Sequence, residues 1–327
     1  MRDVASTAGV SLKTVSRVVN GEAGVSPATA ARVAAAIARL GFARNDLARS
    51  LRHGRAGAVG LVIEDVANPF YSAIARVVED AAHARGHILI TGSCEEDPER
   101  ERQLVQRLLR RLVDALIIVP AGEDHRYLLG DIQAGTPVVF VDRPPRGIDA
   151  DVVLLDNFGG ARAGVEHLLA HGHRRIAFVG DPPQLYTAGE RLAGYRAALA
   201  AAGVGEDPAL ERGSHDAAGA ERAVRDLLAL PADRRPTALF CANNRNTVGA
   251  LRALRDHNEP VALVGFDDFE LADMLSVPIT VVRHEAEELG RLAVELAYAR
   301  LAGDDGLPRR LVIPCDMVIR GSGEVPA

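Results

Sequence analysis

The chain of 327 residues contains no tryptophan, three cysteines and a single lysine, Lys13. Cys94, Cys241 and Cys315 lie far apart and form no CxxC or other metal-ligand spacing, which argues against a zinc site and fits a reduced chain. No apolar run is long enough to span a membrane, and the N-terminus lacks the apolar core of a signal peptide. The sequence therefore predicts a cytoplasmic protein with no membrane association and no bound metal.

Motifs of common enzyme sites are also missing. There is no P-loop, no GxSxG, no HExxH and no GxGxxG after a strand. The pair His171 and His173 has no third ligand nearby, and Ser214, His215 and Asp216 are sequence neighbours whose side chains point apart and cannot form a triad. We therefore expect a protein that is not an enzyme and uses no cofactor.

Basic charge is concentrated at the N-terminal end. The formal net charge is −6, but residues 1–57 hold nine Lys or Arg and three acids, whereas the remainder holds 29 basic and 41 acidic residues. The apolar content of 48% is enough for at least two sizeable cores. A basic head on an acidic body indicates a polyanionic partner such as nucleic acid, with a solvated basic surface as the alternative.

A short amphipathic helix is predicted from about Leu12 to Val19. At about 100° per residue, Val15, Val18 and Val19 share one face. The opposite face is polar and carries Lys13, Ser16, Arg17 and Asn20. Ser11 is a suitable N-cap, and Gly9 allows a tight turn after a first helix that holds Val4, Ala5 and Ala8.

A third helix begins with Ser26 as N-cap and Pro27 at its first position, and it ends at Gly41. Two helices joined by a glycine turn and supported by a third are typical of a helix-turn-helix. The stretches "DVASTAGVSLKTVSRVVNG" and "VSPATAARVAAAIARLGF" closely resemble the headpiece of the LacI/GalR family of transcriptional regulators.

This resemblance implies that the second helix lies in the major groove of double-stranded DNA. The implied base-reading residues are Leu12, Lys13 and Arg17, and the implied phosphate contacts are Thr14, Ser16 and Asn20. The stretch "NDLARSLRHGR" resembles the family's hinge helix, which implies minor-groove contacts by Ala48 and Leu51. The alternative for the hinge is an ordinary linker helix that packs Leu51 on its own protein.

Beyond residue 57, short Val/Ile/Leu runs alternate with amphipathic stretches, which predicts two parallel sheets covered by helices. This pattern resembles the periplasmic-binding-protein-like core of the same family. We therefore expect an all-α helix-turn-helix headpiece at 1–44, a hinge at 45–57, and an α/β core of two parallel-sheet subdomains at 58–327. The first subdomain is expected at about 58–156 plus 284–313, and the second at about 157–283 plus 314–327.

Ligands of open α/β sheets bind beyond the carboxyl ends of the strands, here in a cleft between two sheets. The resemblance implies an effector site there with Arg191 in "GERLAGY", Asn243 in "FCANN" and Asp267 in "VGFDD". It also assigns Asp142 to the pocket edge, and Phe70, Tyr71 and Tyr186 are expected to form apolar walls. Three positions depart from the family pattern: Arg44 stands where a proline is common before the hinge, Asn244 replaces a frequent aspartate, and His284 replaces a common glutamine.

The sequence therefore predicts a homodimeric transcriptional regulator, expected to be a repressor, that binds a pseudo-palindromic DNA operator and responds to a small effector. A sugar or sugar derivative is the expected effector, with a nucleoside or nucleobase as the alternative. A solute-binding protein of transport has the same body fold, but it requires export and has no DNA-binding head.

Overall fold

The computed structural model describes residues 1–20, 22–42, 57–110 and 113–327. The chain divides into two compact units, Met1–Ala56 and Gly57–Ala327, called here the headpiece and the body. The predicted hinge residues Ala48 and Leu51 lie outside the described part of the chain, as does the side chain of Asn20.

The headpiece contains three helices around a small apolar core. They are α1 (Arg2–Ala8), α2 (Leu12–Asn20) and α3 (Pro27–Leu40). Each helix contributes one fully buried valine to the core, namely Val4, Val15 and Val33. The predicted three-helix arrangement, with Val15 on the packed face of α2, is confirmed.

The ends of these helices follow the local sequence signals. The Ser11 hydroxyl accepts a hydrogen bond from the Thr14 amide at 3.1 Å, and Ser26 accepts one from the Thr29 amide at the start of α3. Gly9 has φ 63°, in the left-handed region that lets the chain turn sharply between α1 and α2. The predicted caps at Ser11 and Ser26 and the turn at Gly9 are confirmed.

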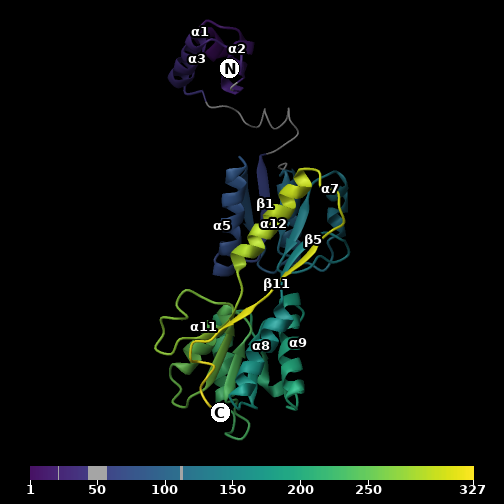
Figure 1. Cartoon of the computed structure of the whole chain (residues 1–327), viewed down its shortest axis with the longest axis vertical. Helices are drawn as coiled ribbons and strands as arrows, with labels where there is room; N and C mark the ends of the chain where they lie inside the picture. The colour runs from purple at the N-terminus through teal and green to yellow at the C-terminus, as the bar shows by residue number, and fades with distance from the viewer. Residues whose placement is uncertain (21, 43–56, 111–112) are drawn as a thin grey trace. The chain divides into compact units, whose positions relative to one another are not determined.

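The body contains two six-stranded sheets, one in each subdomain (Figure 1). The strands of the first sheet are β1 (Ala58–Ile63), β2 (Ile88–Ser93), β3 (Ala115–Ile118), β4 (Val138–Val141), β5 (Asp151–Leu155) and β11 (Arg310–Ile313). The strands of the second are β6 (Ile176–Gly180), β7 (Glu211–Gly213), β8 (Ala238–Cys241), β9 (Ala262–Phe266), β10 (Thr280–Arg283) and β12 (Asp316–Val318). The first sheet has the order β11-β5-β4-β3-β1-β2 and the second the order β12-β10-β9-β8-β6-β7. The second sheet thus repeats the strand order of the first.

Helices cover both sheets. The helices of the first subdomain are α5 (Pro69–Ala84), α6 (Pro98–Arg110), α7 (Leu129–Gln133) and α12 (Ala286–Leu301). Those of the second are α8 (Asn157–Ala170), α9 (Tyr186–Ala201), α10 (Ala217–Leu228) and α11 (Asn244–Leu254). Single 3-10 turns lie at Arg126–Leu128 and Pro208–Leu210. In the first subdomain α5 and α12 pack on one face, and in the second α8 and α9 pack on the face opposite α10 and α11.

The central strands are apolar without alternation because both of their faces are covered. Every residue of β1, β4 and β9 is buried. All strand pairs are parallel except β10 with β12, which is antiparallel. The parallel-sheet fold predicted for the body is confirmed. No helix of the described residues is long and apolar enough to cross a membrane.

The chain passes between the two subdomains three times (Figure 1). It leaves the first sheet after β5 to enter α8, returns after β10 to enter α12, and leaves again between β11 and β12. Three single-chain connections of this kind let the two subdomains change their relative orientation while each keeps its own core.

Candidate functional site

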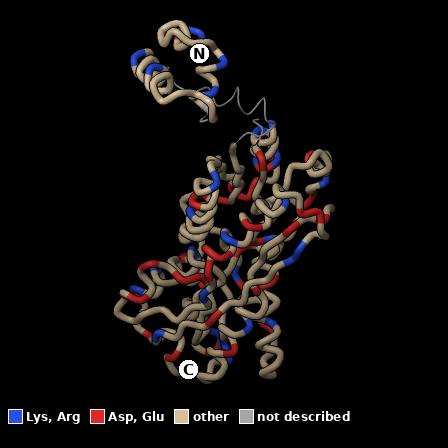
Figure 2. Tube along the Cα trace, turned by 45° about the horizontal axis from the view of Figure 1, so that its top comes forward, with Lys and Arg blue, Asp and Glu red and all other residues tan. Residues whose placement is uncertain are grey.

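The exposed face of α2 carries the residues predicted to read DNA. Val15 is buried in the headpiece core, whereas Leu12 is 48% exposed and Lys13 is exposed. Thr14, Ser16 and Arg17 are half-buried. Figure 2 shows that Lys and Arg outnumber acids on the described part of the headpiece. The face of α2 opposite the buried Val15 is therefore polar and basic, with Lys13 exposed and Arg17 half-buried.

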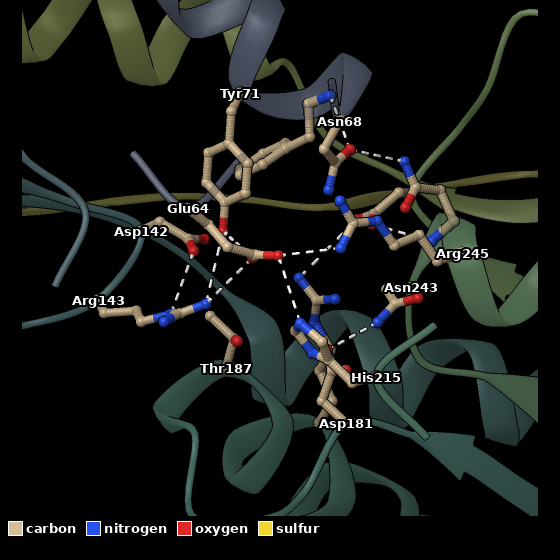
Figure 3. A pocket seen from close by; sticks show the side chains of 14 residues that line it. Glu64, Asn68, Tyr71, Asp142, Arg143, Asp181, Thr187, His215, Asn243 and Arg245 are labelled. Atoms are coloured by element: carbon tan, nitrogen blue, oxygen red, sulfur yellow. Dashed lines mark hydrogen bonds and ion pairs between the residues drawn. The ribbon is translucent and has the colours of Figure 1, made fainter. Parts of the chain in front are cut away.

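A cavity of about 40 Å³ lies in the body between the two subdomains (Figure 3). The first subdomain contributes Glu64, Asn68, Phe70, Tyr71, Asp142 and Arg143 to its wall. The second contributes Asp181, Thr187, Arg191, His215, Asn243, Asn244, Arg245 and Asp267. This volume holds only a few water molecules, so a sugar-sized ligand requires the walls to move.

Left-handed backbone conformations occur in the cavity wall and shortly after β2. Among the described residues, four that are not glycine have a positive φ: Glu95 at 54°, Glu96 at 58°, Asp142 at 68° and Asp267 at 71°. Asp142 directly follows β4 and Asp267 directly follows β9, the equivalent strand of the second sheet. Such conformations cost about 1 to 3 kcal/mol each and typically occur at functional sites.

Asp267 is held by three partners, two in the second subdomain and His284 in the connection between β10 and α12. Its carboxylate accepts hydrogen bonds from the Asn244 amide at 3.2 Å and from His284 Nε2 at 2.8 Å, and Arg191 Nη2 lies 3.8 Å away. Burial alone would raise the pKa of Asp267, but the Arg191 charge and the His284 hydrogen bond outweigh it and hold the pKa below its usual range. The residue is therefore an ionised acceptor.

Arg191 is fixed by neutral groups as well as by Asp267. Its Nε donates to Asn157 Oδ1 at 2.7 Å and its Nη1 to the Ala242 carbonyl at 2.5 Å, and its guanidinium lies 3.7 Å above the centre of the Phe266 ring. These contacts orient the guanidinium so that one edge faces Asp267.

The first subdomain presents a second carboxylate to the cavity. Asp142 is buried and accepts no hydrogen bond from any described residue, and its nearest cation is Arg143, with Nε at 3.6 Å. Burial raises the pKa of Asp142 more than Arg143 and Arg191 lower it. The two Nη atoms of Arg143 point instead to Glu96, at 2.6 and 2.5 Å. Asp142 is therefore an acceptor that still needs a donor.

Glu64 connects both subdomains at the centre of the cavity. It accepts a hydrogen bond from the Tyr71 hydroxyl at 3.0 Å and one from Arg245 Nη1 of the second subdomain at 3.0 Å (Figure 3). Burial and the neighbouring Glu96 raise its pKa from 4.5 to about 7 despite the two arginines nearby. The Glu96 pKa moves the other way, because its hydrogen bonds from Arg143 outweigh its burial.

Further contacts cross the cleft beside Glu64. Arg245 Nη2 lies 2.5 Å from Asp65 Oδ2, and Asn244 Nδ2 donates to Asn68 Oδ1 at 3.1 Å. His215 Nδ1 bonds Asp181 at 3.1 Å, which raises the His215 pKa against the effect of its burial. Polar groups at the N-termini of α5 and α11 thus join the two subdomains directly.

The structure brings six of the seven predicted effector residues together, namely Phe70, Tyr71, Asp142, Arg191, Asn243 and Asp267. Phe70 and Tyr71 meet edge to face with ring centres 4.9 Å apart. Tyr186 does not line this cavity, and its hydroxyl accepts a hydrogen bond from Arg310 at 3.2 Å. Thr187, one residue later on α9, faces the cavity instead.

Several cavity residues escaped the sequence analysis. Glu64 directly follows β1 and Asp181 directly follows β6, so both satisfy the general expectation of polar residues at strand ends, although the resemblance that assigned Asp142 and Asp267 did not name them. Arg245 carries no such signal, because its partners come from the other subdomain.

The described residues offer no cluster of three or more side chains suited to holding a metal ion. In the "HGH" stretch, both ring nitrogens of His173 are engaged, by Thr237 Oγ1 and by the Val325 carbonyl, each at 2.8 Å. This pairing makes His173 a structural residue of the second subdomain.

Two family models match parts of the headpiece and of the body, and whole proteins match nearly the full chain. Residues 1–45 match "Bacterial regulatory proteins, lacI family", and residues 165–323 match "Periplasmic binding protein-like domain". The chain is 34% identical to the ribose operon repressor of Escherichia coli K12 over 98% of this chain and 99% of that one. It is 36% identical to the transcriptional regulator CelR of Thermobifida fusca, over 98% and 97%.

A solved structure covers the same range. The Lac repressor dimer bound to operator and the anti-inducer ONPF matches with a TM-score of 0.85 and 28% identity, over 98% of each chain. A helix-turn-helix head joined to a two-subdomain body with a polar cleft defines a DNA-binding transcriptional regulator, not an enzyme. This chain belongs to the LacI/GalR family, whose repressors bind operator DNA and small-molecule effectors.

Proposed function

We propose that this regulator is a repressor that acts in the cytoplasm as a homodimer on a pseudo-palindromic operator. The exposed basic face of α2 supports Lys13, Arg17 and Leu12 as base contacts, because Val15 fixes which side of the helix is free. A two-fold protein requires two half-sites related by the same symmetry. The assignment includes phosphate contacts by Thr14, Ser16 and Asn20 and minor-groove contacts by Ala48 and Leu51.

We infer that the cleft binds a sugar or sugar derivative. The observation that carries this proposal is the pair Asp142 and Asp267, two buried carboxylates at equivalent strand ends of the two subdomains. Each carboxylate can accept hydrogen bonds from two adjacent hydroxyls, so together they suit a ligand with hydroxyls on opposite edges. Phe70 supplies an apolar wall beside them. A nucleoside has hydroxyls on its ribose edge alone, so it would have to meet the second carboxylate with an amino or ring N–H group of its base.

The proposed mechanism couples the cleft to the head through the orientation of the subdomains. A ligand that enters the 40 Å³ cavity must displace contacts such as Arg245 with Glu64, and so it changes which subdomain arrangement is most stable. Linkage then requires operator and effector to alter each other's affinity by the same factor. The effector weakens operator binding if it favours a subdomain arrangement that separates the two headpieces from the spacing of the half-sites. It strengthens operator binding if it favours the arrangement that holds them at that spacing.

The DNA part of the proposal is tested by selecting bound sequences from random duplexes with the full chain. We expect an enriched site with two inverted half-sites, and enrichment of a single asymmetric half-site would contradict the proposed homodimer. The effector part is tested by melting the full chain with ribose, cellobiose and a set of nucleosides, because a ligand that binds the native state raises the melting temperature. A stabilising sugar should also change operator affinity.

A further inference from the structure

The arginines in the cleft are already engaged by protein groups. Arg143 makes a two-point ion pair with Glu96 at 2.6 and 2.5 Å, and it also donates to the Pro120 carbonyl at 3.0 Å. Arg245 binds Glu64 at 3.0 Å and Asp65 at 2.5 Å. A ligand phosphate or carboxylate would have to replace a carboxylate that the fold itself provides, or bind Arg143 Nε, which has no hydrogen-bond partner and lies 3.6 Å from the Asp142 carboxylate.

The third guanidinium is equally constrained. Arg191 donates to Asn157 and to the Ala242 carbonyl, and its remaining Nη2 lies beside the Asp267 carboxylate at 3.8 Å. An anion that approached Nη2 would come close to an ionised carboxylate, and like charges repel strongly at a buried site.

Carboxylates outnumber guanidiniums around the cavity. The described acids that line it or pair with its arginines are Glu64, Asp65, Glu96, Asp142, Asp181 and Asp267. The guanidiniums are Arg143, Arg191 and Arg245. Even without Glu64, whose pKa is raised to about 7, the other five acids exceed the three guanidiniums. The site therefore carries an excess of acceptors, and Asp142 is an acceptor without a donor.

Helix N-termini, which often bind phosphate, are largely occupied here. The Asn244 amide at the start of α11 donates to Asp267, and the Asn246 amide donates to Asn243 Oδ1. The Phe70 amide at the start of α5 donates to Asn68 Oδ1. The start of α9 has no side-chain cap, so an anion that bound despite the carboxylates would be expected there.

We propose that the cleft is selective for an uncharged polyhydroxy ligand and rejects the phosphorylated or carboxylated form of the same sugar. This inference rests on the proposed sugar-binding function and restricts the ligands to uncharged sugars. The discrimination comes from carboxylates of the protein that occupy the places an anionic group would need, with the donor-free Asp142 left for a ligand hydroxyl.

The first test measures binding of matched pairs to the full chain by isothermal titration calorimetry at about 0.15 M salt, where long-range charge effects are screened. The pairs are ribose with ribose 5-phosphate and glucose with glucose 6-phosphate, with cellobiose as a further uncharged probe. We expect any sugar that binds to bind about tenfold or more tightly than its phosphate. A phosphate that binds as tightly as its parent sugar overturns the inference and leaves the sugar function standing.

A variant tests the cause of the discrimination. Glu96→Gln frees the Nη atoms of Arg143 without lining the cavity itself, so it should raise the affinity for the phosphorylated sugar about tenfold relative to the parent sugar. Glu79→Gln, on the exposed side of α5, is the matched control and should change neither affinity. If Glu96→Gln does not fold, the wild-type pairs still decide the question. If no sugar binds in either form, the sugar function is wrong, and this inference is wrong with it.

Discussion

Glu64→Gln offers a test of the electrostatics of the cleft through its pH dependence. In the native body the Glu64 pKa is raised from 4.5 to about 7, chiefly by burial. The native state therefore holds a proton on Glu64 between these two pH values, whereas the unfolded chain has released it. Protonated Glu64 contributes stability that is fully present below pH 4.5 and is lost as the pH rises through 7.

The shift sets the size of the effect. At about 1.4 kcal/mol per pKa unit, the shift from 4.5 to about 7 corresponds to about 3 kcal/mol at most. The neighbouring Glu96, whose pKa is lowered, changes stability in the opposite direction below pH 4.5, outside this window. Glutamine keeps an acceptor for the Tyr71 hydroxyl and does not titrate.

Thermal melting of the full chain at pH 5, 6, 7 and 8 measures the prediction. The melting temperature of the variant should rise relative to that of the wild type as the pH increases, by roughly 5 to 10 °C across the series, because about 2.5 kcal/mol of the effect falls between pH 5 and 8, at about 2 to 4 °C per kcal/mol for a domain of this size. Glu79→Gln serves as the exposed control. Parallel curves for wild type and Glu64→Gln would refute the reasoning.

Three further predictions concern DNA reading, effector response and stability. Arg17→Ala should weaken operator binding by about 1 to 3 kcal/mol and spare non-specific DNA in gel-shift assays; equal losses on both DNAs would exclude base reading. Asp267→Ala should abolish the change in operator affinity that the effector causes, while operator binding itself persists. The exposed control Asp273→Ala should keep both the operator binding and the response to the effector. Arg191→Leu should lower the free energy of unfolding by about 3 to 5 kcal/mol because it leaves the buried Asp267 carboxylate without its neighbouring cation. Adding Asp267→Asn to the same chain should recover part of that loss. Additive losses in urea denaturation would show that the two residues are uncoupled.

Local signals explain why so much of the fold was predictable. Ser26, Pro27 and Gly41 each act within one helical turn, so the bounds of α3 follow from neighbouring residues. The buried strands of the body are runs of apolar residues whose meaning does not depend on distant contacts. Acids directly after such strands, such as Asp142 and Asp267, must lie at one edge of a parallel sheet.

The rest depended on geometry that no local pattern contains. Tyr186 was expected in the effector site, but α9 begins at that residue, and a step of one position rotates a side chain by about 100°, which places Thr187 at the cavity. The contacts of Arg245 with Glu64 and Asp65 join residues about 180 positions apart in separate subdomains. Their pairing follows from how the two subdomains face each other, which sequence periodicity does not encode.

The four left-handed residues at the strand ends, Glu95, Glu96, Asp142 and Asp267, affect how this protein would evolve under artificial selection. Glycine adopts such backbone conformations without strain, and asparagine adopts them more readily than glutamate does. A library selected for heat resistance alone should therefore accumulate those residues at these positions, as a trade of activity for robustness. The carboxylates that make the cleft discriminating would be the first to disappear, and the most durable descendants would be regulators that hold their operator but no longer respond to any ligand.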